Sequence, residues 1–204
     1  MNRIVTISAA YGAGGSVVAP AVAAALDFPL LDRAVMGGPA SGRGMASEAA
    51  QDEERTGGLW GRMLVALAQM PDAGAAEPVP TLSGDQALRR EAETRLRRFV
   101  ADGEGVVLGW AGALVIPDAY RVRLHGPKDG RVRQAMRIDN RIGEEQARKQ
   151  LEETDHVRTL YWRRLYRADW TDASRYHLVI DTTAIALGAV TDLVLHGARA
   201  FWSR

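Results

Sequence analysis

The sequence predicts an α/β domain of three layers, in which helices cover both faces of a central parallel sheet of about five strands. The first observation is the β-branched run at residues 4–8, which is typical of a buried strand. The second is an alanine-rich helical stretch at residues 17–26, which a short apolar run at residues 28–31 follows. Strand, helix and strand in this order form a βαβ unit, and such units build parallel sheets. The length of 204 residues suits one domain over residues 1–204.

The other elements follow from the same kinds of pattern. Short apolar or alternating runs predict strands at residues 105–109, 120–124 and 177–181. Helices are expected at residues 59–70, 87–102, 129–137, 144–153, 155–166 and 187–201. Residues 71–86 hold three prolines and several small residues without periodicity, which predicts a surface loop.

The composition excludes several classes of protein. Lys and Arg number 26 and Asp and Glu number 25, and this balance argues against a dedicated nucleic-acid binder. A hydrophobic fraction of 47% excludes disorder as the dominant state, and the absence of cysteine excludes disulfides and thiolate metal sites. The four histidines lack the spacing of metal ligands. Because the apolar runs are short and residues 1–8 do not form a signal peptide, we expect a cytoplasmic protein that binds neither nucleic acid nor a membrane.

A glycine-rich loop between the first strand and the first helix is the strongest functional signal. It contains Gly12, Ala13, Gly14, Gly15 and Ser16. The start of a helix presents unpaired N–H groups and the positive end of the helix dipole, so it binds phosphate readily. Glycine lets the backbone approach a phosphate closely and adopt positive φ, and the Ser16 hydroxyl could bind Mg²⁺. We expect phosphate binding here; the alternative is a tight turn that needs glycine for its geometry alone.

A dinucleotide-binding fold is a second interpretation of this segment. Asp32 lies about twenty residues beyond Gly12, where such a fold places its ribose-binding acid. However, Val17 replaces the third glycine of that fingerprint, and the second half of the chain lacks repeated strand–helix crossovers. The dinucleotide interpretation is therefore the weaker one.

An arginine-rich stretch in the second half is the other functional signal. Residues 121–141 hold seven Lys or Arg against two Asp, and residues 158–167 add four arginines with no acid between them. The planar guanidinium group clamps phosphoryl oxygens. On an ideal helix Asp155 and Arg158 fall near one face, so Asp155 could orient Arg158. The alternative is a solvated helix face, but beside a glycine loop phosphate handling is the better interpretation.

Six segments along the chain occur in a characteristic order, and the ordered set is a more specific family signal than any single segment. They are IVTISAAYGAGGSVVA (4–19), PLLDR (29–33), VVLGWAGALVIPD (106–118), RVRQAMR (131–137), DHVR (155–158) and YHLVIDT (176–182). The set resembles the cytidylate kinase-like family of the nucleoside monophosphate kinases, whose loop is similar in having Tyr-Gly-x-Gly-Gly. This resemblance implies a P-loop kinase-like fold with a helical lid.

The resemblance also implies an activity: transfer of a phosphoryl group from ATP, with Mg²⁺, to a nucleoside monophosphate. The glycine loop would hold the donor phosphates and Ser16 the metal ion. Residues 127–170 would form the lid, whose closure excludes water, and residues 34–104 an acceptor-side helical insertion. The implied catalytic residues are Arg131, Arg158 and Asp155, and the implied acceptor-binding residues are Asp32, Arg33 and Trp110.

Departures from the family pattern leave other functions open. Ala9 stands in the place of the first glycine of the P-loop pattern, and Gly15 in the place of the lysine that bridges donor phosphates. Trp110 stands where related kinases have an arginine that binds the acceptor's phosphate. Two alternatives therefore remain: a catalytically weakened nucleotide-binding protein with a regulatory or partner-binding role, and a small-molecule kinase with a non-nucleotide acceptor. The sequence does not determine the oligomeric state.

Overall fold

The computed structural model describes residues 2–32, 82–109 and 111–204. Its strands are β1 (Arg3–Ala9), β2 (Leu30–Asp32), β3 (Glu104–Leu108), β4 (Tyr120–His125) and β5 (Leu178–Asp181). They form one parallel sheet in the order β2-β3-β1-β4-β5. The described helices are α1 (Gly15–Leu26), α4 (Leu82–Phe99), α5 (Gly112–Val115), α6 (Lys128–Ile138), α7 (Glu144–Tyr166) and α8 (Leu187–Trp202), with a 3₁₀ turn at Ala173–Arg175.

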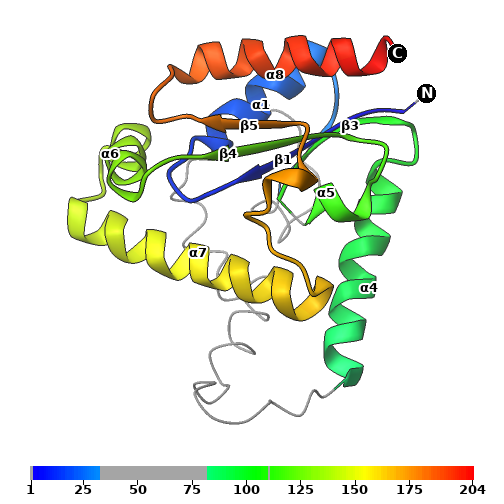
Figure 1. Ribbon diagram of the computed structural model, residues 1–204, viewed down its shortest axis with the longest axis horizontal. Helices are drawn as coiled ribbons and strands as arrows, with labels where there is room; N and C mark the ends of the chain where they lie inside the picture. The colour runs from blue at the N-terminus through cyan, green and yellow to red at the C-terminus, as the bar shows by residue number, and fades with distance from the viewer. Residues whose placement is uncertain (1, 33–81, 110) are drawn as a thin grey trace.

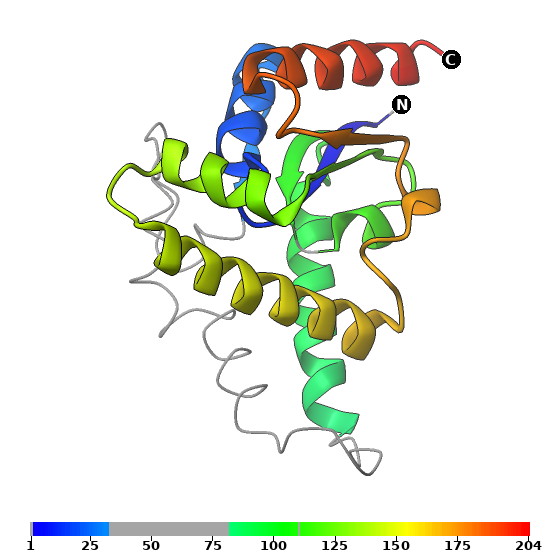
Figure 2. The same ribbon diagram turned by 60° about the vertical axis from the view of Figure 1, so that its left-hand side comes forward.

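Helices cover both faces of the sheet, which confirms the predicted three-layer α/β architecture. Helices α1 and α8 pack together on one face, while α4, α5 and α7 lie on the other (Figures 1 and 2). Helix α6 follows β4 and packs against α7 at one end of the sheet. No helix within the described ranges is long and apolar enough to cross a membrane.

Strand β1 is central because it pairs with β3 on one side and with β4 on the other. Its residues alternate between two covered faces, so five of its seven residues are buried. Ile4, Val5 and Ile7 are at most 1% exposed. Full burial of such a side chain stabilises a fold by about 1.5–3 kcal/mol relative to exposure. The β-branched run detected in the sequence is therefore the centre of the core.

The carboxyl ends of the five strands all lie at one edge of the sheet, because every neighbouring pair is parallel. The glycine loop leaves β1 at this edge, α6 begins just after β4, and Thr182 directly follows β5. In open α/β sheets, ligands bind outside the carboxyl ends of the strands. The topology thus brings three segments that are distant in sequence to the place where a ligand is expected.

Two stretches of the prediction differ from the structure by more than two residues, and the short helix α5 was not predicted. Residues 82–86 belong to α4 rather than to a surface loop, because the last proline of that stretch is Pro80 and the helix accommodates Gly84 in its first turn. The helices predicted at residues 144–153 and 155–166 form the single helix α7. Asp155, at which the prediction began a second helix, lies inside α7, and its carboxylate pairs with Arg131 of α6 and with Arg158. The helix predicted at residues 59–70 lies outside the described residues.

Candidate functional site

The glycine loop folds into a buried turn between β1 and α1. Gly12 has a φ of 70° and Gly14, the N-cap of α1, has a φ of 74°. Both values lie in the left-handed region, which costs other residues about 1–2 kcal/mol. Such a turn aligns successive backbone N–H groups toward a common point, the arrangement that proteins use to bind anions. The loop therefore has glycines with positive φ at two of its positions, as an anion-binding turn needs, and phosphate binding itself remains a prediction.

The glycines also have a packing role that the sequence did not indicate. A Cβ atom on Gly12 would collide with the backbone carbonyl oxygen of Arg131, and one on Gly14 would lie 2.5 Å from Leu187 Cδ2. At Gly15 the nearest atom would be Ala9 Cβ, at 2.6 Å. The missing side chains thus face protein atoms of β1, α6 and α8. Close packing behind the loop, in addition to space for a phosphate, accounts for glycine at these positions.

Three consecutive carbonyl groups of the loop accept hydrogen bonds from side chains behind it. Arg131 Nη1 donates to the carbonyl of Tyr11 (2.9 Å), and Gln134 Nε2 donates to that of Gly12 (3.0 Å). The Thr182 hydroxyl donates to the carbonyl of Ala13 (3.0 Å). Arg131, Gln134 and Thr182 are 6%, 7% and 0% exposed. The loop is therefore fixed by buried polar groups from α6 and from the end of β5.

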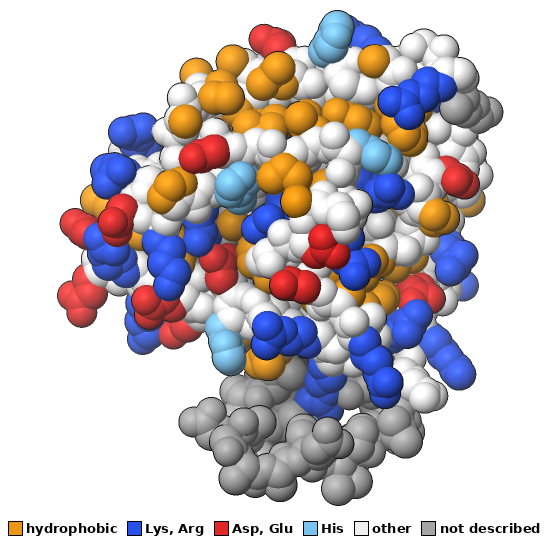
Figure 3. Space-filling model, in the orientation of Figure 1, with side chains coloured by type: hydrophobic (Ala, Val, Ile, Leu, Met, Phe, Trp, Pro, Cys, Tyr) orange, Lys and Arg blue, Asp and Glu red, His pale blue; other side chains and the backbone are white. Residues whose placement is uncertain are grey.

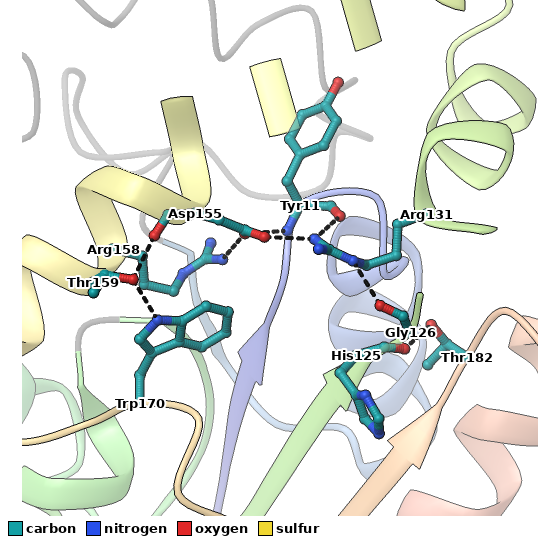
Figure 4. A network of polar contacts seen from close by, with 9 residues as sticks. All are labelled: Tyr11, His125, Gly126, Arg131, Asp155, Arg158, Thr159, Trp170 and Thr182. Atoms are coloured by element: carbon teal, nitrogen blue, oxygen red, sulfur yellow. Dashed lines mark hydrogen bonds and ion pairs between the residues drawn. The ribbon is translucent and has the colours of Figure 1, made fainter. Parts of the chain in front are cut away.

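Asp155 joins the predicted catalytic residues into one network (Figure 4). Its Oδ2 lies 2.7 Å from Arg131 Nη1, and its Oδ1 lies 3.3 Å from both Arg158 Nη1 and the Tyr11 backbone nitrogen. The three side chains predicted to be catalytic thus meet beside the first residue of the loop. Their roles in catalysis remain predictions.

An aromatic residue supports this network from one side. The Arg158 guanidinium lies 5.0 Å from the centre of the Trp170 ring, a cation–π geometry. The Trp170 indole donates to the Thr159 hydroxyl (3.0 Å), which in turn donates to the Asp155 backbone carbonyl (2.8 Å). Arg123 approaches the same ring at 5.1 Å. These contacts hold Arg158 in one orientation relative to the carboxylate of Asp155.

Tyr11 connects the loop to the predicted lid. Its ring is 9% exposed and packs in an apolar cluster with Val132 and Ala135 of α6 and Ala147 and Leu151 of α7. Its hydroxyl donates to Gln150 Oε1 at 2.5 Å. Helices α6 and α7, which make up most of residues 127–170, are therefore in direct contact with the loop.

The arginines of helices α6 and α7 divide into two groups. Arg131 and Arg158 are buried, so the solvated-face interpretation does not describe them. Arg148, in contrast, is exposed and pairs with Asp129 (2.8 Å) and Glu144 (2.8 Å). Figure 3 shows that basic and acidic side chains are interspersed on this face over α6 and α7. Exposed pairs of this kind contribute little stability, so the functional interest lies in the buried arginines.

Two titratable groups at the carboxyl edge have shifted pKa values. Burial lowers the pKa of His125, as do the nearby charges of Arg123 and Arg131, while Asp181 acts in the opposite direction. The pKa of Asp181 is lowered chiefly by its hydrogen bond from the Thr183 hydroxyl. The edge therefore favours a neutral imidazole and an ionised carboxylate at neutral pH.

The other predicted site residues lie farther apart or outside the described ranges. Ser16 is the second residue of α1 and is half-buried. Asp32 ends β2, which β3 separates from β1 in the sheet. Arg33 and Trp110 lie outside the described residues. Among the side chains that the structure describes, no group of three or more His, Cys, Asp or Glu could hold a metal ion by itself.

Sequence reasoning missed Gln134, Thr182, Tyr11 and Trp170 as parts of the site. Gln134 and Thr182 lie within the segments RVRQAMR and YHLVIDT, which carry the family resemblance, but neither residue was given a role from the sequence. The rule that ligands bind at the carboxyl ends of parallel strands could have singled out Thr182, which directly follows β5. No local pattern indicates that Gln134 reaches the loop, because 122 residues separate it from Gly12.

Comparisons with known proteins identify the family and the fold of the chain. Residues 4–184 match a family described as the cytidylate kinase-like family. A crystal structure of an uncharacterized protein from Eubacterium ventriosum is similar over 98% of this chain and 99% of its own, with a TM-score of 0.64 and 18% identity. A gluconokinase from Sinorhizobium meliloti is similar over 97% and 91%, with a TM-score of 0.52 and 15% identity. At these identities the two structures establish a shared fold. The search of curated proteins gave no match.

Proposed function

Because the chain belongs to the cytidylate kinase-like family and has its P-loop kinase-like fold, we propose that it transfers a phosphoryl group from ATP to a nucleoside monophosphate. The observation that carries the proposal is the fixed glycine loop beside two buried arginines. Carbonyls of Tyr11, Gly12 and Ala13 are bound from behind, and Arg131 and Arg158 share the carboxylate of Asp155 next to the loop.

The loop fits the phosphate chain of a nucleotide. Gly12 and Gly14 have positive φ, and Gly15 begins α1, so its N–H has no acceptor within the helix. These amides, with the positive end of the α1 dipole, would hold the donor phosphates. Bound ATP supplies the phosphoryl group, and Mg²⁺ neutralises charge on its oxygens. Ser16 would hold the metal ion together with phosphate oxygens, which suits an ion that keeps few protein ligands.

The chain must neutralise phosphate charge without a lysine in the loop. Lys128 and Lys149, the two lysines of the sequence, both lie outside it. A side chain at Gly15 would meet Ala9 Cβ at 2.6 Å and Leu108 Cδ1 at 3.2 Å, so the lysine position of the P-loop pattern is filled by protein atoms. The buried guanidinium groups of Arg131 and Arg158 both lie against the carboxylate of Asp155 next to the loop, and their positive charge can serve in place of the lysine. We propose that Arg158 directs this charge toward the transferring group.

The acceptor site is the less defined half of the proposal. Asp32 lies at the carboxyl end of β2, on the side of β1 opposite to β4. We propose that it binds the acceptor together with Arg33 and Trp110, as the family resemblance implies. Trp110 replaces the family's phosphate-binding arginine. Because of this substitution, two alternative functions remain open: a small-molecule kinase with a non-nucleotide acceptor, and a nucleotide-binding protein with weakened catalysis.

A phosphotransfer screen tests the proposal. Purified protein is incubated with ATP and Mg²⁺ and with each nucleoside monophosphate or a panel of sugar acids and hydroxy acids, while ATP affinity is measured by calorimetry. We expect ATP binding and formation of a nucleoside diphosphate. Turnover with only a non-nucleotide acceptor would favour the small-molecule kinase. ATP binding without turnover would favour the nucleotide-binding protein with weakened catalysis. Absence of both ATP binding and turnover would refute the proposal.

A further inference from the structure

Two buried polar side chains, Gln134 and Thr182, hold carbonyl groups of the loop, and the function proposed above assigns no role in ATP binding to either of them. Gln134 is 7% exposed and Thr182 is fully buried. Burial of an amide or hydroxyl is unfavourable unless hydrogen bonds compensate for the lost water. Here the compensation comes from the loop itself and from the pair's own contact, in which Gln134 Nε2 donates to Thr182 Oγ1 at 3.2 Å.

Their hydrogen bonds determine the direction of two peptide groups. Gln134 Nε2 donates to the Gly12 carbonyl at 3.0 Å. The single hydroxyl proton of Thr182 has two carbonyl acceptors within reach, Ala13 at 3.0 Å and His125 at 3.2 Å. The loop carbonyl of Ala13 is the nearer of the two. Both side chains thus point their donors at the same side of the loop.

In a trans peptide the C=O of one residue and the N–H of the next point in opposite directions. When the Ala13 carbonyl is turned toward Thr182, the Gly14 N–H is turned away from it. When the Tyr11 carbonyl is turned toward Arg131, the Gly12 N–H is likewise turned away. The N–H of Ala13 donates within the loop, to the carbonyl of Ala10 (3.0 Å). The N–H groups of Gly12 and Gly14 are therefore directed to the side of the loop away from these donors.

We infer that Gln134 and Thr182 are positioning residues, which hold the loop in its anion-binding conformation before a nucleotide arrives. The inference rests on the proposed function, because it concerns the binding of the ATP phosphate chain. A loop without lysine depends on its amides for this binding, and amides that are already oriented need no reorganisation when the phosphates enter. Thr182 orients the Gly14 amide, while Gln134 holds the intervening Gly12 carbonyl and the Thr182 hydroxyl.

The test compares ATP affinities of matched variants by calorimetry, at a temperature where circular dichroism shows each variant to be folded. Thr182→Val removes the hydroxyl at nearly constant volume, and Gln134→Met removes the amide at similar length. Thr182→Ser keeps the donor. Thr191→Val is the control, because Thr191 is also buried but its hydroxyl donates within α8, to the Leu187 carbonyl at 3.0 Å.

We expect Thr182→Val and Gln134→Met each to weaken ATP binding about tenfold, which corresponds to the loss of one net hydrogen bond. Thr182→Ser and Thr191→Val should bind ATP as the wild type does. Equal affinity of folded Thr182→Val and wild-type protein would overturn the inference and leave the proposed function intact, since the wild type still binds. If only one of Thr182→Val and Gln134→Met folds, the ATP affinity of that variant decides whether the inference holds. If neither folds, the two side chains are structural and the inference is wrong. Failure of the wild type to bind ATP would instead refute the proposed function.

Discussion

Arg131 of α6 and Asp155 of α7 form an ion pair of 2.7 Å in which the two side chains are only 7% and 21% exposed. The same carboxylate lies 3.3 Å from Arg158. One partly buried acid therefore pairs with two arginines from two helices, and it also accepts a hydrogen bond from the Tyr11 N–H at the start of the loop. The position of the loop relative to α7 depends on this carboxylate.

Removing the charge of Asp155 should destabilise the protein strongly. Asp155→Asn keeps the shape but removes the negative charge that Arg131 and Arg158 share, and breaking a buried pair costs about 3 kcal/mol. Urea denaturation measures the change in unfolding free energy. The matched control is Asp129→Asn, because Asp129 pairs with Arg148 at the exposed surface, and there we expect no measurable change. Similar effects of the two substitutions would contradict the central position of Asp155.

Arg158→Ala should lower turnover more than ATP affinity, since an arginine at the transferring group acts mainly on charge that develops in the transition state. We expect a loss in kcat on the order of a hundredfold or more at saturating ATP. Arg163→Ala, an exposed residue of the same helix, is the control. Thermal unfolding must accompany the kinetics, because Arg158 also stacks on Trp170. Normal turnover of a folded Arg158→Ala protein would assign this arginine a structural role only.

The contact between Ala9 and Gly15 should appear as energetic coupling. Gly15→Ala places a methyl group 2.6 Å from Ala9 Cβ, and overpacking of this kind costs about 1–3 kcal/mol. In the Ala9→Gly background the same substitution should cost less by about 1 kcal/mol, which a double-mutant cycle of urea unfolding measures. Gly188→Ala is the control, because a Cβ there meets no atom within 4 Å, and it should be neutral or stabilising. Additive effects at positions 9 and 15 would show that the two residues do not compete for space.

Stability should fall on acidification through His125. Its pKa is lowered below the ordinary 6.5, chiefly by burial, so the unfolded chain takes up a proton at higher pH than the folded one. The stabilisation is therefore present above about pH 6.5 and is lost as the pH falls below that value. His177, whose pKa is also lowered by burial, acts in the same direction.

Unfolding free energy measured between about pH 7.5 and pH 5.5 checks this sign. We expect His125→Gln to have a shallower pH dependence than the wild type. The lowered pKa of Asp181 lies below its ordinary 3.8, so this carboxylate contributes only at more acidic pH. Identical profiles for the wild type and His125→Gln would remove His125 as the cause.

The sheet was predictable because buried parallel strands require continuous apolar runs, and residues 4–8 have no other favourable environment. The loop was predictable because its glycines directly follow such a run. The hydrogen bonds from side chains to the loop carbonyls were not predictable. Thr182 and Ala13, for example, are 169 residues apart, and no periodicity in the sequence indicates which polar groups meet. The continuity of α7 was missed because two adjoining helices and one long helix have the same apolar period, and Asp155, where the prediction divided them, lies within the single helix.

The close approach of Ala9 and Gly15 limits how this family of sequences can change. A lineage that regained lysine at position 15 by one mutation would first pass through a chain with a steric clash. A lineage that began with glycine at position 9 would lose packing within a central strand and gain nothing until the second mutation. Each single step is expected to lower stability in a marginally stable protein, so the two substitutions would have to occur together. Descendants of this loop are expected to gain new cationic groups on α6 or α7 rather than to restore the lysine.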